Sequence, residues 1–449
     1  MTTNSTIRSR AAEEVSAASG ALFRIGFGIV GVILVFRFFA RGWIESLLIE
    51  PAYHFSYPGF EWVRVWPEPW MHVQFLVIGL AALGIALGYH YRLSAALFAL
   101  SLGYVELIDR SLYLNHYYWV VLTAGVMVFL PLNAAYSLDA RRGRVRTPGS
   151  YPAWVIWMLH FQVGMVYVFA GLAKLNGDWL LRAEPLSTWL PARSDMWLIG
   201  PVLTLPVVAY LFSWAGAFFD LTIVAWLSWR PARPYAYVAL VVFHTLTWLM
   251  FPSIGVFPLL MSLSALVFFD PAWPEHFLPQ ERSDVRRGGP KGRRGSFGAR
   301  HPLEPAWIGV GAIYVLIMIA LPLRHHLTPG DVKWTGEGYL GSWQVMLSEK
   351  SASADFIVTD PATGKTWTVP PPEYLTERQQ MVMATDPVMI RQTARLIADD
   401  LGGHVEVAAD VRLSFNGRMS RPFTDPEVVI SEAPLTEGIE GFILAQPSG

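Results

Sequence analysis

Cysteine is absent from the 449 residues of this chain, and charged residues are scarce. The lack of cysteine excludes disulfides, thiolate metal sites and cysteine nucleophiles, and it leaves the redox compartment undetermined. Asp, Glu, Lys and Arg make up 15% of the sequence, against about 25% in an ordinary soluble domain, whereas hydrophobic residues make up 53%. A soluble fold could not bury so much apolar surface without a very large core, so the composition predicts an integral membrane protein.

Several chemical motifs are also missing. The net charge is −1, so no basic field indicates a nucleic-acid partner. The histidines are scattered, without carboxylates at helical spacing from them, and we therefore expect no metal site. The sequence has neither a phosphate-binding glycine-rich loop before a helix nor a nucleophile elbow. Functional candidates must therefore be sought among polar residues near the apolar stretches.

Nine apolar stretches are candidates for crossing a bilayer, which takes about 20 mainly apolar residues. They lie at about 21–40, 71–90, 93–110, 117–134, 152–175, 200–229, 235–250, 253–270 and 306–323. The first is interpreted as a retained span rather than a cleaved signal peptide, because no small-residue cleavage site follows it. The seventh and eighth are the weakest, because little more than Phe251-Pro252 separates them. They could instead form one broken helix or a re-entrant pair.

The charges of the connecting loops predict the orientation. Basic clusters occupy the second, fourth, sixth and eighth connections, at 91–92, 141–146, 230–233 and 285–300, whereas the odd-numbered connections are mixed or acidic. Since basic loops stay in the cytoplasm, residues 1–20 are predicted to be a cytoplasmic segment. With nine spans, the C-terminus then lies on the extracytoplasmic side.

The sequence changes character at about residue 326. Residues 355–359 and 405–415 alternate in the manner of strands, and 360–364 and Asn416-Gly417 supply turns. Residues 387–401 read as a helix that Asp386 caps. We therefore predict a predominantly α-helical polytopic membrane protein with about nine transmembrane helices. Its membrane domain comprises residues 21–325, and residues 326–449 form a small extracytoplasmic α+β domain.

Lys174 is the most conspicuous ionisable residue, because it follows a long apolar stretch at the outer end of the fifth predicted span. One interpretation is an anchor whose ammonium reaches towards the interface. The other is a general base, because burial disfavours an ammonium and a buried lysine can act as a free amine.

Histidines provide the other candidates. Asn115-His116 lies in the short outer loop before the fourth span, His244 falls inside the seventh span, and His325 follows the ninth. His116 is interpreted either as an interfacial hydrogen-bonding residue, the commoner case at a helix mouth, or as a functional residue. His244 is either a satisfied core histidine or a pocket residue, and His325 is by default part of a basic, aromatic anchor at the interface. Asn115, His116, Lys174 and His325 all project from the outer side and could line one mouth. His160 and Asp220 also fall within spans, without a local partner in the sequence.

Several blocks of sequence share their order and spacing with one known family. They include Leu107 to Arg110 before Asn115-His116, Val166 to Trp179, Phe243-His244, Ser253 to Phe257, Lys333-Trp334, Gly341-Ser342-Trp343 and Ser414 to Arg418. Through these blocks the chain, from Leu22 to about Glu432, resembles the vitamin K-dependent gamma-carboxylase family. The small size suggests a short, bacterial-type member.

The resemblance implies an integral membrane enzyme that couples two reactions. A catalytic lysine deprotonates reduced vitamin K, a phylloquinone- or menaquinone-type hydroquinone, which O2 then converts to a strongly basic alkoxide and finally to the epoxide. The alkoxide removes a proton from a glutamate of a protein or peptide, and the resulting carbanion adds CO2. The implied partners are therefore the lipid bilayer, the quinone and a glutamate-containing substrate.

The resemblance also implies roles for individual residues. The catalytic lysine falls on Lys174, and a functional histidine falls on His116, next to an orienting Asn115. His244 and His325 take family histidine positions with less settled roles. Trp334 and Trp343 are expected either to pack on the quinone or to hold the C-terminal domain against the mouth.

The chain departs from the family pattern in three ways. Ala173 stands where the family has the first of two lysines, the chain lacks the further extracytoplasmic region of the animal enzymes, and it lacks the cysteines of their disulfide. These departures leave two alternatives open. One is a quinol epoxidase or oxidase that carboxylates nothing, and the other is a non-catalytic membrane scaffold.

Overall fold

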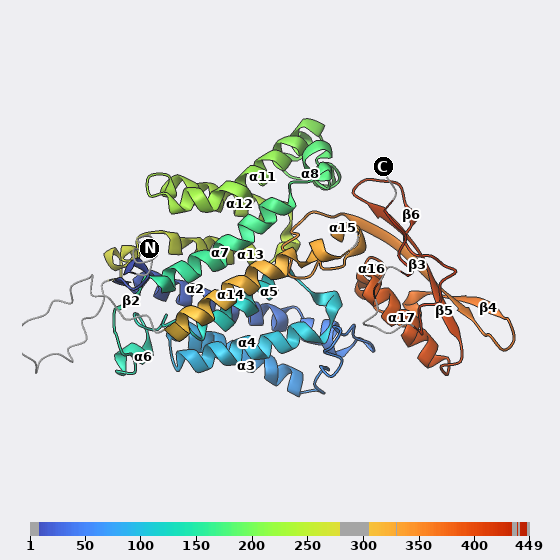
Figure 1. Ribbon diagram of the computed structural model, residues 1–449, viewed down its shortest axis with the longest axis horizontal. Helices are drawn as coiled ribbons and strands as arrows, with labels where there is room; N and C mark the ends of the chain where they lie inside the picture. The colour runs from blue at the N-terminus through green and yellow to red at the C-terminus, as the bar shows by residue number, and fades with distance from the viewer. Residues whose placement is uncertain (1–8, 279–304, 329, 433–437, 439–440, 447–449) are drawn as a thin grey trace, which may run out of the picture.

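The computed structural model describes residues 9–278, 305–328, 330–432, 438 and 441–446. Long helices lie side by side in one large bundle, and a smaller domain containing a sheet is attached at one end of it (Figure 1). The prediction of a mostly helical membrane protein with a small C-terminal α+β domain is confirmed at this level.

Helices occupy all nine predicted stretches within the described residues. They are α2 (Ala18–Ala40), α3 (Trp70–Leu87), α4 (Tyr91–Ile108), α5 (Asn115–Met127), α7 (Trp154–Ala173), α11 (Pro206–Ser228), α12 (Arg233–Met250), α13 (Phe257–Ser264) and α14 (Pro305–Leu323). Six segments are long and apolar enough to cross a membrane: α2, α3, α4, α7, α11 and the segment Gly309–Leu327. Because α5, α12 and α13 are not among these six, the crossing number of nine stays a prediction.

Some boundaries differ from the prediction for local reasons. Helix α5 ends at Met127 rather than near 134, just before Pro131, whose ring cannot continue a helix. The sixth stretch is divided into α10 (Gly200–Leu203) and α11, and Pro206 begins the second of these helices. Helices α12 and α13 are separate, because the turn η4 (Pro252–Ile254) and Gly255, with φ of 68°, reverse the chain between them.

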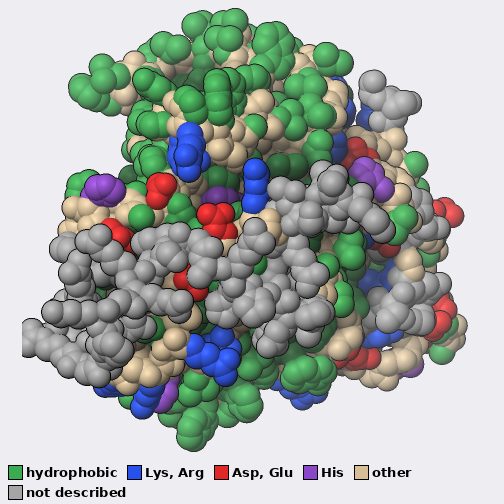
Figure 2. Space-filling view, turned by 60° about the vertical axis from the view of Figure 1, so that its left-hand side comes forward, with side chains coloured by type: hydrophobic (Ala, Val, Ile, Leu, Met, Phe, Trp, Pro, Cys, Tyr) green, Lys and Arg blue, Asp and Glu red, His purple; other side chains and the backbone are tan. Residues whose placement is uncertain are grey.

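Helix α2 packs against α3 and α13. It approaches α3 so closely at Gly28 that an added Cβ would lie 2.5 Å from the backbone nitrogen of Ala86. On the outside, large apolar side chains such as Leu80, Leu100 and Phe218 are exposed. Hydrophobic side chains cover the surface at the top of Figure 2, where Figure 1 places α11 and α12. An exposed apolar belt of this kind is expected of helices that face lipid.

The N-terminal segment and several basic connections lie together at the end opposite the C-terminal domain (Figure 1). Strand β1 (Glu14–Ser16) pairs antiparallel with β2 (Ser150–Pro152), and the α6 turn (Leu138–Arg141) lies nearby. The carboxylate of Asp139 accepts hydrogen bonds from the backbone amides of His90 and Tyr91, at 3.0 and 2.9 Å. The connections at 91–92 and 141–146 therefore share one end, as predicted. The basic loop 285–300 lies outside the described residues.

The C-terminal domain is a four-stranded antiparallel sheet with helices packed on it. The strand order is β4-β3-β5-β6, and Asp355 of β3 lies opposite Asp410 of β5. Asp386 caps helix α17 (Pro387–Asp400) by accepting hydrogen bonds from the amides of Val388 and Met389, as the sequence predicts. The elements are β3 (Lys350–Thr359), β4 (Thr366–Val369), α16 (Glu377–Met383), α17 (Pro387–Asp400), β5 (Glu406–Phe415) and β6 (Arg421–Pro422).

Ion pairs join this domain to the outer loops of the bundle. Arg418 donates two hydrogen bonds to Asp178 of α8 (Gly177–Arg182), at 2.9 and 2.6 Å, and Asn416 donates a third at 3.0 Å. Burial alone would raise the pKa of Asp178, but these hydrogen bonds and the Arg418 charge outweigh it and hold that pKa below its ordinary value. A second pair joins Arg110 to Asp386 at 2.9 Å.

Candidate active site

Lys174 follows the last residue of α7 and is buried rather than extended towards water. Its Nζ donates a hydrogen bond of 2.7 Å to Oδ2 of Asp220 on α11, and the two residues are 6% and 5% exposed. Gly171 permits this contact, because a Cβ there would lie 2.8 Å from the backbone nitrogen of Leu221. A lysine that merely anchors a helix end holds its ammonium in water. Lys174 is therefore part of a buried ion pair and not an anchor that reaches into water.

The Lys174–Asp220 pair faces a cavity of about 140 Å³, which we call the lysine chamber. A second polar pair lies in its wall, where the hydroxyl of Tyr167 and Nε2 of His244 are 2.7 Å apart. The indole ring of Trp179 lies 5.1 Å from Nζ of Lys174. The rest of the lining is mainly apolar and includes Leu186, Phe212, Phe243, Leu246, Met250, Phe251 and Phe257.

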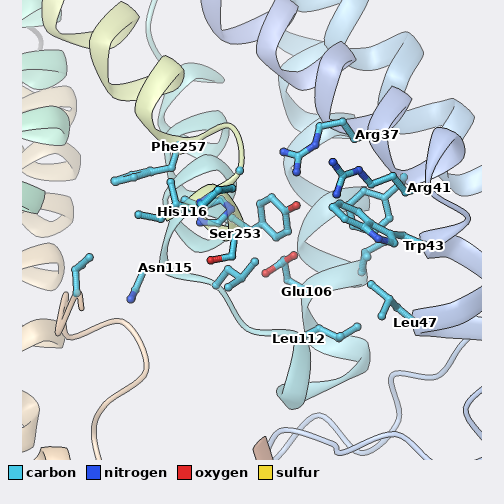
Figure 3. A pocket seen from close by; sticks show the side chains of 18 of the residues that line it. Arg37, Arg41, Trp43, Leu47, Glu106, Leu112, Asn115, His116, Ser253 and Phe257 are labelled. Atoms are coloured by element: carbon cyan, nitrogen blue, oxygen red, sulfur yellow. The ribbon is translucent and has the colours of Figure 1, made fainter. Parts of the chain in front are cut away.

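A larger cavity of about 540 Å³ adjoins it, which we call the arginine chamber. Arg37 and Glu106 approach it from α2 and α4, and His116 enters from the start of α5 (Figure 3). Arg41 and Arg378 also line it, and the guanidinium groups of Arg37 and Arg41 each lie 5.2 Å from the ring of Trp43.

The arginine chamber holds arginines without a carboxylate partner among the described residues. Within the described residues, no carboxylate lies within 4.0 Å of the guanidinium groups of Arg37, Arg41 or Arg378. The buried Oε2 atom of Glu106 has no hydrogen-bond partner there either. Unpaired charges at a cavity are costly unless water or a ligand satisfies them, so this chamber is suited to a polar, anionic ligand.

A thin apolar wall separates the two chambers. The ring of Phe257 lies between two histidines, with its centroid 5.8 Å from that of His116 and 6.1 Å from that of His244. Val345 and Met346 come from the C-terminal part of the chain and line both chambers, as do Val166 and Ile254. Met346 and the neighbouring Trp343 have φ of 57°, a conformation that costs energy for large side chains and is often found at functional sites.

The predicted site residues are divided among several places. Asn115 and His116 line the arginine chamber together with Trp343, whereas Lys174 and His244 line the lysine chamber. The hydroxyl of Tyr113 donates to Oδ1 of Asn115 at 3.0 Å.

His325 and Trp334 lie outside both chambers. His325 lines a separate groove of about 550 Å³ between α7 and the end of α14, where its Nδ1 is 2.7 Å from the carbonyl oxygen of Pro322. Trp334 is 3% exposed in the core of the C-terminal domain, and its indole donates to the carbonyl oxygen of Leu444 at 2.9 Å. The four residues expected to line one mouth therefore occupy three cavities, and Trp334 is a core residue of the C-terminal domain.

Several residues of the site were not identified from the sequence. Asp220 was noted as a carboxylate within a span, but its partner Lys174 lies 46 residues away. The position of Asp220 deep in an apolar stretch was the signal that the sequence offered. Arg37, Glu106 and Tyr167 were not singled out as site residues, since each fits an ordinary helix end or helix face.

Comparisons with known proteins agree with this architecture. The family model for the HTTM domain matches residues 13–273, which is more than half of the chain. The family model described as "Vitamin K-dependent gamma-carboxylase, lumenal domain" matches residues 303–444. No solved structure matches the chain. The two matches follow each other in the order of the helical bundle and the C-terminal domain, and the chain belongs to the vitamin K-dependent gamma-carboxylase family.

Proposed function

We propose that this protein is a membrane enzyme that oxidises reduced vitamin K with O2 and uses the energy released to carboxylate a glutamate residue with CO2. Lys174 acts as the general base, and His116 acts beside the glutamyl substrate. One observation carries the proposal: a buried lysine–carboxylate pair faces an apolar chamber, and a chamber with unpaired charges adjoins it.

The lysine chamber suits the ring of a quinol. An apolar cavity of about 150 Å³ accommodates a single aromatic ring such as benzene, and the lysine chamber, at about 140 Å³, has room for the hydroxyl-bearing ring of the quinol. Phe212, Phe243 and Phe251 would contact the ring faces, and Lys174 would meet a ring hydroxyl. Bound there, reduced vitamin K would supply both the electrons for O2 and the strong base that a glutamyl carbon requires.

Asp220 makes the base role of Lys174 chemically reasonable. Lys174 can accept a proton only as a free amine, and the carboxylate 2.7 Å away can hold the proton that the ammonium loses. The pair has no net charge in either form, so this transfer does not leave an isolated charge in the apolar chamber. The hydroxyl of Tyr167 and the ring of His244 satisfy each other and leave Lys174 as the basic group of the chamber.

The arginine chamber suits the glutamyl side chain. Arg37 and Arg41 can bind its carboxylate, because guanidinium groups form strong, often bidentate bonds with carboxylates. His116 lies in the same chamber, across Phe257 from the lysine chamber, which places it near a carbon presented at the wall. The charged lining favours carboxylation over quinol oxidation alone, because an oxidase would have no need of three unpaired guanidinium groups.

We also propose the orientation and domain limits that the loop charges predict. Residues 1–20 lie in the cytoplasm, residues 21–325 form the membrane domain, and residues 326–449 form the extracytoplasmic domain. Both chambers then lie towards the extracytoplasmic ends of α4, α5 and α7, where a quinone from the bilayer and a polypeptide from water can meet.

An assay with detergent-solubilised full-length protein tests the proposal. Reduced vitamin K, O2, labelled CO2 and a glutamate-containing peptide are supplied, and epoxide and incorporated label are measured separately. We expect Lys174→Ala to lower epoxide formation by about 10²–10⁴-fold, the usual contribution of a general base. Lys365→Ala, at an exposed lysine of the C-terminal domain, is the matched control and should behave as wild type.

Three outcomes separate the alternatives. Epoxide without label would favour a quinol oxidase, and neither product would favour a scaffold. Wild-type epoxide formation by Lys174→Ala would exclude this lysine as the base.

A further inference from the structure

A third cavity lies where the outer loop after α4 meets the C-terminal domain. This junction cavity has a volume of about 320 Å³ and shares no lining residue with either chamber. Ser111 and Tyr113 line it from the loop, and Ser348 and Lys350 line it from the start of the sheet. The proposed reaction assigns it no role.

Lys350 brings to the junction cavity a positive charge without a direct ion pair among the described residues. Its Nζ donates to the carbonyl oxygens of Trp334 and Thr385, at 3.0 and 3.4 Å, and within the described residues no carboxylate lies within 4.0 Å of it. Because an ammonium has three donors, one remains for a ligand. Burial lowers the pKa of Lys350 to about 8, although Asp386 and Asp331 oppose this shift.

The other charges at the junction cavity have partners. Arg110 is paired with Asp386 at 2.9 Å, and Lys333 is paired with Asp331 at 3.4 Å. Glu349 also lines the cavity, and its carboxylate accepts a hydrogen bond from the indole of Trp189.

Two hydroxyl groups at the cavity lack partners. The Oγ atoms of Ser111 and Ser348 are buried and form no hydrogen bond within the described structure, and Ser111 as a whole is only 4% exposed. A buried hydroxyl without a partner loses the hydrogen bonds that water would give it and is therefore costly. Their presence beside the free donor of Lys350 indicates a cradle of hydrogen-bond donors that a ligand completes.

We infer that the junction cavity binds a small carboxylate-type anion, held by Lys350, Ser111 and Ser348. Two sources offer this chemistry: bicarbonate in solution, and a carboxylate of an acidic polypeptide. Binding of the anion in the junction cavity would also affect the arginine chamber through Tyr113, which lines the junction cavity. Its hydroxyl accepts a hydrogen bond from the amide of Gly341 at 2.8 Å and donates one to Asn115 at 3.0 Å. The inference stands apart from the proposed function, since binding here requires no turnover.

Calorimetric titration of the full-length protein in detergent tests the inference, with bicarbonate in one arm and a glutamate-containing peptide in the other. Wild type should bind at least one of them. Ser111→Ala/Ser348→Ala removes the two hydroxyls without removing a charge and should weaken binding roughly tenfold or more, the value of a hydrogen bond to a charged group. Lys350→Met should abolish the component of binding that the double serine variant weakens and leave any component that Arg37→Met removes, whereas Lys365→Met should bind as wild type.

The pH dependence supplies a second readout. Affinity should fall between pH 7 and 9 as Lys350 loses its proton, and Lys350→Arg should remove this dependence. A loss of affinity in the double serine variant for bicarbonate alone or for the peptide alone identifies the source, and either result supports the site. Should neither bind, or should the double serine variant bind both as tightly as wild type, the inference is overturned. The serine variant keeps the test decisive even if Lys350→Met fails to fold.

Discussion

The two chambers of the candidate active site treat their charges in opposite ways. In the lysine chamber, Lys174 is paired with Asp220 and Tyr167 with His244. In the arginine chamber, three guanidinium groups have no carboxylate partner and the Oε2 atom of Glu106 has no hydrogen-bond partner within the described residues. A single wall at Phe257 separates them.

This difference indicates which kind of ligand each chamber can bind. Where the protein satisfies its own charges, a ligand of low polarity enters without exposing an unpaired group. A chamber with unpaired charges favours a ligand of the opposite charge, because such a ligand neutralises them and other ligands leave them unpaired. The contrast therefore separates a neutral ring from an anionic side chain by electrostatics as well as by size.

The largest expected effect comes from breaking the pair in the lysine chamber. Asp220→Ala leaves Lys174 buried without its counter-charge, and removal of one partner of a buried pair costs about 3–5 kcal/mol. We expect a marked fall of the thermal midpoint in detergent together with loss of epoxide formation. The double variant Lys174→Met/Asp220→Leu should regain stability but not activity. A single variant as stable as wild type would show that the pair is not a buried ion pair.

The next effect concerns the arginine chamber. Arg37→Met should raise KM for a glutamate peptide roughly 10–100-fold, since a hydrogen bond to a charged group contributes about 1.5–3 kcal/mol. Epoxide formation without peptide should be nearly unchanged, because Arg37 does not line the lysine chamber. Arg92→Met, at an exposed arginine of the opposite end, is the control. Equal losses of both activities would remove the distinction between the chambers.

Opening the wall tests whether the chambers act together. Phe257→Leu removes the ring between His116 and His244, and aromatic contacts of this kind contribute about 0.5–1.5 kcal/mol. We expect the ratio of epoxide to carboxylated peptide to rise roughly two- to tenfold for the same reason. An unchanged ratio would mean that the wall has no part in coupling the two reactions.

The smallest effect lies outside both chambers, at the Asp178–Arg418 pair. Arg418→Met should lower stability by about 1 kcal/mol, because this partly exposed pair is worth little more than a surface ion pair. The folded-state pKa of Asp178 is below its ordinary value of 3.8, so the contribution is present above that pH and disappears as pH falls through the folded value. Unfolding curves at pH 7 and pH 3 should show the difference between variant and wild type shrinking with acid. A difference that grew with acid would contradict this assignment.

Local sequence signals predict the elements well but not the contacts between them. Apolar runs place the helices, and Asp386-Pro387 and Asn416-Gly417 mark a helix start and a turn that the structure contains. The predicted end of α5 is too late, because the apolar sequence continues past Met127, whereas the helix cannot continue through Pro131.

The candidate site was harder to predict, because it depends on how helices rotate against one another. Lys174 and His116 were recognised from motif blocks, but the partner of Lys174 depends on the packing of α7 against α11 at Gly171. His325 follows a span as Lys174 does, yet it faces a different groove, since the register of a helix end within a bundle is a tertiary property.

The segment from Trp343 to Met346 belongs to the C-terminal part of the chain, yet it forms part of the wall of both chambers. The helical bundle alone therefore does not enclose a complete reaction space. A chimera could combine the helical bundle of one family member with the C-terminal domain of another. Its chamber walls would not match unless residues 343–346 came from the same protein as the bundle.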